Sequence, residues 1–111
     1  PAAPTRREGR VPSRAFVVRA ATGERIEVPA DGAYHVVGRS VTSELTVGGN
    51  GNISRRHAEL AVLADGLHVR DAGSANGSFV GNRRLAAGTE AAVGPGESFR
   101  LADEVFRYEP A

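Results

Sequence analysis

The sequence predicts an all-β fold, a two-sheet β-sandwich of about eleven short strands. Short runs rich in Val, Leu, Ile and Ala recur at roughly ten-residue spacing, and turn-forming residues separate them. No window keeps the 3.6-residue period of an amphipathic helix. Many short strands at this spacing are typical of sandwiches and barrels.

In the first half of the chain, the apolar run at 15–19 is an expected strand, and 25–28 alternates cleanly after the turn at 21–24. The strand at 33–37 runs into Gly38-Arg39, and a short strand at 44–47 precedes a loose Gly/Asn-rich loop. In the second half, the alternating run 57–63 and the strand 67–71 meet at Asp65-Gly66, a hairpin signal. Further strands are expected at 78–80, 83–85, 90–93, 98–101 and 104–109.

The composition bounds the kind of protein. At 111 residues the chain is expected to form one domain. It has no Cys and no Lys, which excludes disulfides, zinc–thiolate sites, a Walker-A lysine and a Schiff-base lysine. A net charge of +1 gives no strong field for nucleic acid. No signal peptide or membrane-length apolar run is present, so we expect a cytoplasmic location without membrane insertion. We also expect the isolated domain to be monomeric.

The chain divides near residue 13. Residues 1–13 are rich in Pro, Ala and Arg and have no periodicity, so we expect a flexible linker. Residues 14–111 are expected to form the β-sandwich domain. The arginines of the first segment are interpreted as a solvated tether.

Three polar blocks lie between the expected strands, and they carry the chemistry of the chain. They are Gly38-Arg39, Ser54-Arg55-Arg56-His57 and Asn76-Gly77-Ser78. Together they offer a guanidinium, a hydroxyl and a carboxamide. This set suits a phosphate attached to an extended peptide, since phosphate needs charge-assisted donors at fixed positions.

These blocks, in this order and at these spacings, resemble the forkhead-associated (FHA) domain family, from about Ala15 to Tyr108. The resemblance implies a non-catalytic β-sandwich whose loops at one end bind phosphothreonine peptides in a Ser/Thr kinase pathway, with preference over phosphoserine. It implies a partner protein carrying phosphothreonine, such as a kinase or its substrate, and no cofactor or metal. The expected phosphopeptide-binding residues are Arg39, Ser54, Arg55 and Asn76. The expected structural supports of the binding loops are Gly38, His57 and Gly77; Arg56 is expected to be solvated.

Two departures from the family pattern stand out. Ala75 occupies a position that is often Thr in the family, so one phosphate donor is missing, and Ser74 and Ser78 are candidates to replace it. Leu101-Ala102 stands where the family has an apolar residue followed by Gly. We expect this second change to affect only a turn.

The sequence predicts neither a catalytic triad nor a metal site. A catalytic triad of Ser54, His57 and Asp71 lacks a nucleophile elbow, and the three scattered histidines do not predict a metal site. The alternative function is an FHA-like scaffold that binds an unphosphorylated partner or self-associates through a sheet face.

Overall fold

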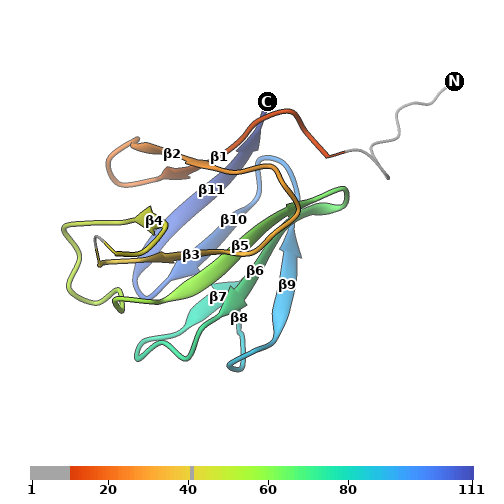
Figure 1. The fold of residues 1–111 in the computed structure, drawn as a ribbon. Helices are drawn as coiled ribbons and strands as arrows, with labels where there is room; N and C mark the ends of the chain where they lie inside the picture. Colours follow the sequence, from red (N-terminus) through yellow and green to blue (C-terminus); the bar gives the residue numbers. More distant parts are fainter. Residues whose placement is uncertain (1–10, 41) are drawn as a thin grey trace, which may run out of the picture.

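Two sheets pack face to face to form the sandwich (Figure 1). The structure is a computed structural model that describes residues 11–40 and 42–111. Its strands are β1 (Ala15–Arg19), β2 (Arg25–Val28), β3 (His35–Gly38), β4 (Leu45–Thr46), β5 (Ala58–Leu63), β6 (Gly66–Asp71), β7 (Ser78–Val80), β8 (Arg83–Arg84), β9 (Glu90–Val93), β10 (Ser98–Leu101) and β11 (Glu104–Pro110). The predicted all-β sandwich is confirmed, and no helix occurs in the described part of the chain.

The first sheet has the strand order β2-β1-β11-β10-β7-β8, and the second has the order β4-β3-β5-β6-β9. All pairs are antiparallel except β3 with β4. The pairs β1–β2, β5–β6, β7–β8 and β10–β11 are hairpins, whereas β1 also pairs with β11 from the far end of the sequence, with Val17 opposite Tyr108. This pairing closes the domain, because it joins the first and last strands in one sheet.

The core lies between the inner faces of the sheets. Its largest fully buried side chains include Tyr108, Phe106, Leu60 and Leu67. The rings of Phe99 and Phe106 stack with their centroids 5.4 Å apart. Because Trp and Met are absent, aliphatic side chains from both sheets fill most of the remaining volume.

The turn between β10 and β11 contains Ala102, which has φ of 57° and is the one non-glycine residue with positive φ in the described ranges. A left-handed conformation costs an alanine about 1–2 kcal/mol. Ala102 is buried, and its N–H donates to the carbonyl of Gly77 at 2.9 Å. The departure from Gly at this position therefore strains a turn that also contacts the loop before β7.

The connections 39–44, 47–57, 72–77 and 102–103 lie at one end of the sandwich and are called here the loop end (Figure 1). The β1–β2 turn lies beside the last of them, since the N–H of Ala20 donates to the carbonyl of Val105 at 3.0 Å. The termini of the sandwich lie at the opposite end, where the N–H of Ala111 donates to the carbonyl of Arg14 at 2.8 Å. Of the predicted linker 1–13, residues 1–10 are outside the described residues, and residues 11–13 precede β1 without regular structure.

The described residues include no helix that is both long and apolar enough to cross a bilayer.

Candidate functional site

The end of β3 is held against the loop 47–57 by backbone hydrogen bonds. Arg39 donates its N–H to the carbonyl of Ser54 at 3.0 Å, and Ser40 donates to the carbonyl of Arg55 at 3.4 Å. Gly38 makes this approach possible: a Cβ on Gly38 would lie 1.9 Å from the carbonyl oxygen of Arg55. Only glycine therefore allows the second loop to cross directly over the end of β3.

The guanidinium of Arg39 is anchored at one atom and open at the others. Its Nε donates to the carbonyl of Ile53 at 2.8 Å. The residue is exposed, and among the described residues no carboxylate pairs with it. The anchored Nε fixes the plane of the group, so both terminal nitrogens remain available as a fork for two oxygens of one anion.

Ser54 and Asn76 connect the loops 47–57 and 72–77. The hydroxyl oxygen of Ser54 accepts the N–H of Ala75 at 3.1 Å, so its own proton is left to donate. The Nδ2 of Asn76 donates to the carbonyl of Asn52 at 2.7 Å. Both side chains thus lie where the two loops meet, and the amide oxygen of Asn76 remains exposed as an acceptor.

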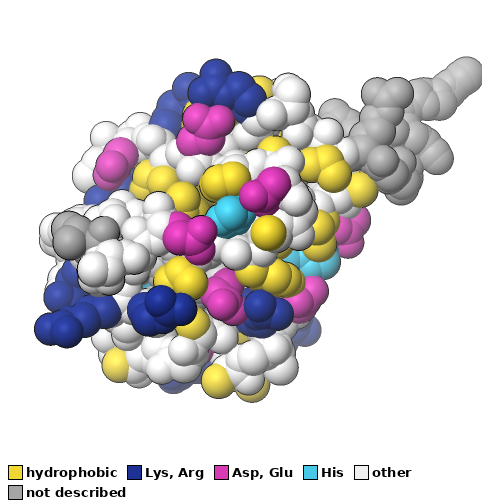
Figure 2. Space-filling model, in the orientation of Figure 1, with side chains coloured by type: hydrophobic (Ala, Val, Ile, Leu, Met, Phe, Trp, Pro, Cys, Tyr) yellow, Lys and Arg dark blue, Asp and Glu magenta, His cyan; other side chains and the backbone are white. Residues whose placement is uncertain are grey.

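Arg55 and Arg56 are exposed and make no ion pair with the described residues. The backbone of Arg55 is fixed, because its carbonyl accepts the Ser43 hydroxyl at 2.7 Å. Figure 2 shows arginine side chains (dark blue) at the loop end, at the lower left of the view. The loop end is therefore basic, and its arginines are not neutralised by the domain itself.

His57 has no exposed surface and uses both ring nitrogens. Its Nδ1 accepts the N–H of Ser54 at 2.9 Å, which requires the proton to be on Nε2. That Nε2 donates to the carbonyl of Gly77 at 2.7 Å. One imidazole therefore links the loop carrying Ser54 to the loop carrying Asn76, from beneath the surface.

Gly77 has φ of 90°, in the left-handed region that favours glycine. A Cβ there would also lie 2.7 Å from Nε of Arg84 and 3.1 Å from the ring of Phe79. A side chain at this position would therefore strain the turn after Asn76 and would displace Arg84.

Sequence reasoning missed the role of Asp71, which it considered only as a triad member. Its Oδ1 accepts the hydroxyls of Ser74 and Ser78, each at 2.6 Å, and its Oδ2 accepts the N–H groups of Gly73 and Ser74 at 2.9 and 3.0 Å. Burial raises the pKa of Asp71, but these hydrogen bonds outweigh it and hold the pKa below its ordinary value. The spacing of Asp and Ser three residues apart was the available sequence signal for such a capped loop.

These bonds also show whether Ser74 or Ser78 can supply the phosphate donor that is missing at Ala75. Ser74 and Ser78 both donate their hydroxyl protons inward to Asp71, so neither has a proton for an anion outside the loop. The expectation that one of them compensates is wrong in this arrangement. Ala75 itself is exposed and offers no side-chain donor.

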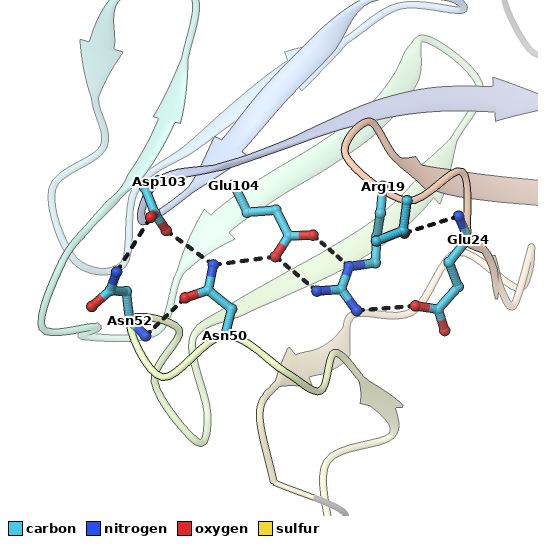
Figure 3. A network of polar contacts seen from close by, with 7 residues as sticks. Arg19, Glu24, Asn50, Asn52, Asp103 and Glu104 are labelled. Carbon is cyan, nitrogen blue, oxygen red and sulfur yellow. Dashed lines mark hydrogen bonds and ion pairs between the residues drawn. The ribbon is translucent and has the colours of Figure 1, made fainter.

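A second network, also missed from the sequence, holds the tip of the loop 47–57 (Figure 3). Asn50 and Asn52 donate their side-chain amides to Asp103 at 3.0 and 3.3 Å, and Asn50 also reaches Glu104 at 3.3 Å. Glu104 is buried and paired with the buried Arg19. The Gly-rich loop is therefore tied to the β10–β11 turn and, through Arg19, to β1.

The comparisons with known proteins agree with this architecture. The family pattern described as "FHA domain" matches residues 35–102, which is more than half of the chain. The chain belongs to the FHA domain family. The comparison with curated proteins found no match.

Solved structures of other FHA domains are similar to this FHA domain in fold. They include Mycobacterium tuberculosis EmbR in complex with a low-affinity phosphopeptide, with a TM-score of 0.72 and 23% identity over 88% of this chain. The chain spans only 24% of EmbR. The N-terminal FHA domain of S. cerevisiae Rad53p, in complex with a phosphothreonine peptide, has a TM-score of 0.73 and 13% identity, and the match covers 88% of this chain and 94% of that one. The FHA domain of CT664 from Chlamydia trachomatis has a TM-score of 0.74 and 20% identity, covering 89% and 99% of the two chains.

Within this FHA domain the sequence-predicted residues occupy two layers of the loop end. Arg39, Ser54 and Asn76 are joined by hydrogen bonds between their loops, and Arg55 is exposed on the same loop as Ser54. Beneath them are the three buried residues Gly38, His57 and Gly77. The carboxylate of Asp71 bonds to serines and backbone N–H groups, so it does not orient His57 as a triad would require.

Proposed function

We propose that this FHA domain is a non-catalytic module that binds phosphothreonine on partner proteins in a Ser/Thr kinase pathway. The observation that carries the proposal is the convergence of an open guanidinium, a free hydroxyl proton and an open carboxamide from three loops. A phosphate near neutral pH carries close to two negative charges and three acceptor oxygens, which these groups match. Membership of the FHA family and the phosphopeptide complexes of EmbR and Rad53p support the same function.

In this proposal each residue has a distinct task. Arg39 pairs with phosphate oxygens through its terminal nitrogens, and Ser54 donates its hydroxyl to a third. Asn76 hydrogen-bonds the backbone of the bound peptide and fixes its register. Arg55 adds positive charge at the rim of the site. Gly38, His57 and Gly77 hold the loops without touching the ligand.

A role in a Ser/Thr kinase pathway implies the kind of partner and the compartment in which it is met. The partner is a protein that carries phosphothreonine, such as a Ser/Thr kinase or its substrate, and the proposed compartment is the cytoplasm. Residues 1–13 are proposed to act as a linker that tethers residues 14–111 as the binding domain. The site requires no cofactor or metal for binding.

The first test is the substitution Arg39→Ala, measured against phosphothreonine peptides selected from a library by the wild-type domain. Losing a charge-assisted contact at a binding site costs about 2–5 kcal/mol when the contact is buried, and less at a rim. We therefore expect the dissociation constant to rise at least tenfold, while the melting temperature stays within error.

Arg25→Ala is the matched control, because Arg25 is exposed and makes no ion pair in the described ranges. Its guanidinium stacks 4.0 Å from the Phe16 centroid, on the edge strand of the first sheet opposite β7 and β8. This substitution should leave binding unchanged. Equal binding of phosphorylated and unphosphorylated peptides would refute the proposal and favour the phosphate-independent scaffold.

A further inference from the structure

Arg84, on the edge strand β8, lies directly against the binding loop. A Cβ built on Gly77 would be 2.7 Å from its Nε and 3.0 Å from its Cζ, so the guanidinium packs against the backbone of the residue that follows Asn76. Arg84 is exposed. Its charge is therefore presented immediately beside the residue proposed to hold the peptide backbone.

Arg84 belongs to a stack on the outer face of the first sheet. Phe79 on β7 is paired in register with Arg84 on one side and with Arg100 of β10 on the other. The Cζ of Arg100 lies 3.8 Å from the centroid of the Phe79 ring, and the Cζ of Arg84 lies 5.9 Å from it. We call Arg84, Phe79 and Arg100 the arginine stack. The ring orients both guanidinium groups but does not neutralise their charge.

Within the part of the chain that the structure describes, no carboxylate forms an ion pair with the stack. Four other arginines form ion pairs with glutamates, namely Arg14, Arg19, Arg70 and Arg107. Among the described residues, Arg84 and Arg100 form none. Arg100 donates from Nη1 to the carbonyl of Ala102 at 2.5 Å, which positions it without cancelling its charge.

Two carboxylates lie close by, and both are already bonded to other groups. Asp71 lines the same open hollow of about 410 Å³ as Arg84, but it is buried and already accepts four hydrogen bonds. Asp103 is close enough for the charge of Arg100 to lower its pKa, after larger effects from Asn50 and Asn52. Its two oxygens accept those amides. The stack therefore keeps unpaired positive charge at the border of the site.

We propose that the arginine stack is a subsite for an acidic side chain, Asp or Glu, of the phosphothreonine-bearing partner. This inference rests on the proposed function, because the phosphate and Asn76 bring the peptide to the loop end. An extended peptide advances about 3.3 Å per residue, so a residue two or three positions from the one held by Asn76 lies roughly 7–10 Å away. A carboxylate at that distance reaches the guanidinium of Arg84, which contacts the neighbouring Gly77.

The geometry favours a carboxylate over a nucleic-acid base. A base binds single-stranded sites by stacking on an open aromatic face. Arg100 covers Phe79 at 3.8 Å, so that face is occupied. The stack presents the edges of two guanidinium groups to solvent, and such edges suit a planar anion such as a carboxylate.

The test measures dissociation constants for pairs of phosphothreonine peptides that differ by a single Glu or Gln, scanned over the positions flanking the phosphothreonine. Exposed ion pairs contribute about 0.2–1 kcal/mol, so at one or two positions Glu should bind about 1.4- to fivefold more tightly than Gln. The preference should shrink as salt rises, because the pair is exposed. Arg84→Gln should abolish the preference while the Gln peptide keeps its affinity.

The charge reversal Arg84→Glu distinguishes an effect of charge from a distortion of the binding loop. It should invert the preference, so that Lys at the same peptide position binds more tightly than Glu. Arg25→Gln is the matched control, because Arg25 is also an exposed arginine that stacks on an aromatic ring, 4.0 Å from the Phe16 centroid. It lies on β2, the edge strand at the other side of the same sheet from β8. This substitution should leave the Glu preference intact.

The outcomes separate the two proposals. If no phosphothreonine peptide binds the wild-type domain, the proposed function fails and the subsite fails with it. If such peptides bind but show no acidic preference, or one that Arg84→Gln and Arg84→Glu leave unchanged, the subsite alone is refuted.

Discussion

At the scale of single residues, His57 shows how a buried polar side chain can organise a surface site. It satisfies one N–H and one carbonyl that belong to different loops, at 2.9 and 2.7 Å. The imidazole accepts with one nitrogen and donates with the other, a pairing that a neutral histidine can provide at this spacing. Because His57 is buried, it can affect ligand binding only by positioning these two loops.

We expect His57→Leu to lower the free energy of unfolding by about 3 kcal/mol, because it leaves the N–H of Ser54 and the carbonyl of Gly77 without partners. Phosphopeptide affinity should fall as well, since the two loops lose their link. Urea denaturation and peptide titration measure the two effects. His68→Leu is the control: His68 is only partly buried and far from the loop end, so peptide affinity should be unchanged. Wild-type stability in His57→Leu would contradict this role.

At the scale of elements, the loop end depends on two backbone arrangements. The first is the crossing of the loop 47–57 over the end of β3. The backbone of the crossing loop leaves no room for a side chain at position 38, which is Gly38. The second is the loop 72–77, which wraps around the carboxylate of Asp71. Neither arrangement involves the side chain of a proposed ligand-binding residue, yet each sets the position of a loop that carries one.

Gly38→Ala should destabilise the domain by about 3 kcal/mol, because its Cβ would meet backbone atoms of Arg55 that cannot rotate away. Phosphopeptide binding should be weakened more than tenfold, since Ser54 and Arg39 would be pushed apart. Thermal denaturation and titration with the library-selected peptide measure both.

Gly51→Ala makes the same chemical change in the same loop, where nothing lies within 4 Å of an added Cβ. It should change stability by less than about 0.5 kcal/mol. Similar effects of the two substitutions would show that the crossing at Gly38 is not what fixes the loop.

Asp71→Asn should destabilise the domain by about 3 kcal/mol, because an amide nitrogen replaces an oxygen that accepts two donors and leaves them facing a third. Hydrogen exchange at the amides of Gly73 and Ser74 should quicken, which places the loss in this loop. Asp65→Asn, at an exposed carboxylate on the β5–β6 turn, is the control and should leave these two amides protected. Unchanged exchange in Asp71→Asn would contradict the proposed support of the loop.

At the scale of the whole molecule, two histidines outside the loop end couple stability to pH. His35 contacts Asp31 at 2.8 Å and Glu44 at 2.9 Å, and His68 contacts Asp65 at 2.7 Å and Glu90 at 2.8 Å. Burial lowers the pKa of each imidazole, but hydrogen bonds to these carboxylates outweigh it and raise the pKa above 6.5. Each protonated imidazole is therefore stabilised by folding.

The sign of the pH dependence follows. A raised histidine pKa gives stability that is complete below about 6.5 and is lost as the pH rises through the folded-state value. The lowered pKa values of Asp31, Glu44 and Glu90 give stability that is lost as the pH falls through them. We expect maximal stability at mildly acidic pH, with a drop in melting temperature of a few degrees by pH 8.

Melting temperatures measured from pH 4 to pH 9 check this expectation. The double variant with His35→Gln and His68→Gln should lose the decline on the alkaline side. It should also weaken the decline on the acidic side, because the same histidines lower the pKa values of Asp31, Glu44 and Glu90. A wild-type profile that rises between pH 6 and pH 8 would contradict the assignment.

The strands could be predicted because their signals are local. Alternation marked Arg25–Val28 and Ala58–Leu63, and turn residues such as Gly81-Asn82 marked the hairpins. The burial of Arg19 could not be predicted from its strand alone, because Phe16 and Val18 make the outer face of β1 as apolar as the inner one. Its partner Glu104 is 85 positions away, so no sequence spacing could reveal the pair.

The sequence by itself determined the sandwich and the three blocks with phosphate-binding chemistry, since alternation, turn residues and short motifs act over a few residues. The tertiary structure decided which groups remain free to act. It showed that the hydroxyls of Ser74 and Ser78 are used by Asp71, and that Asn50 ties its loop to Asp103. It also left Arg84 unpaired beside Gly77. The physical reason is that a polar side chain's partner is set by which distant strands and loops the topology brings within about 3 Å of it.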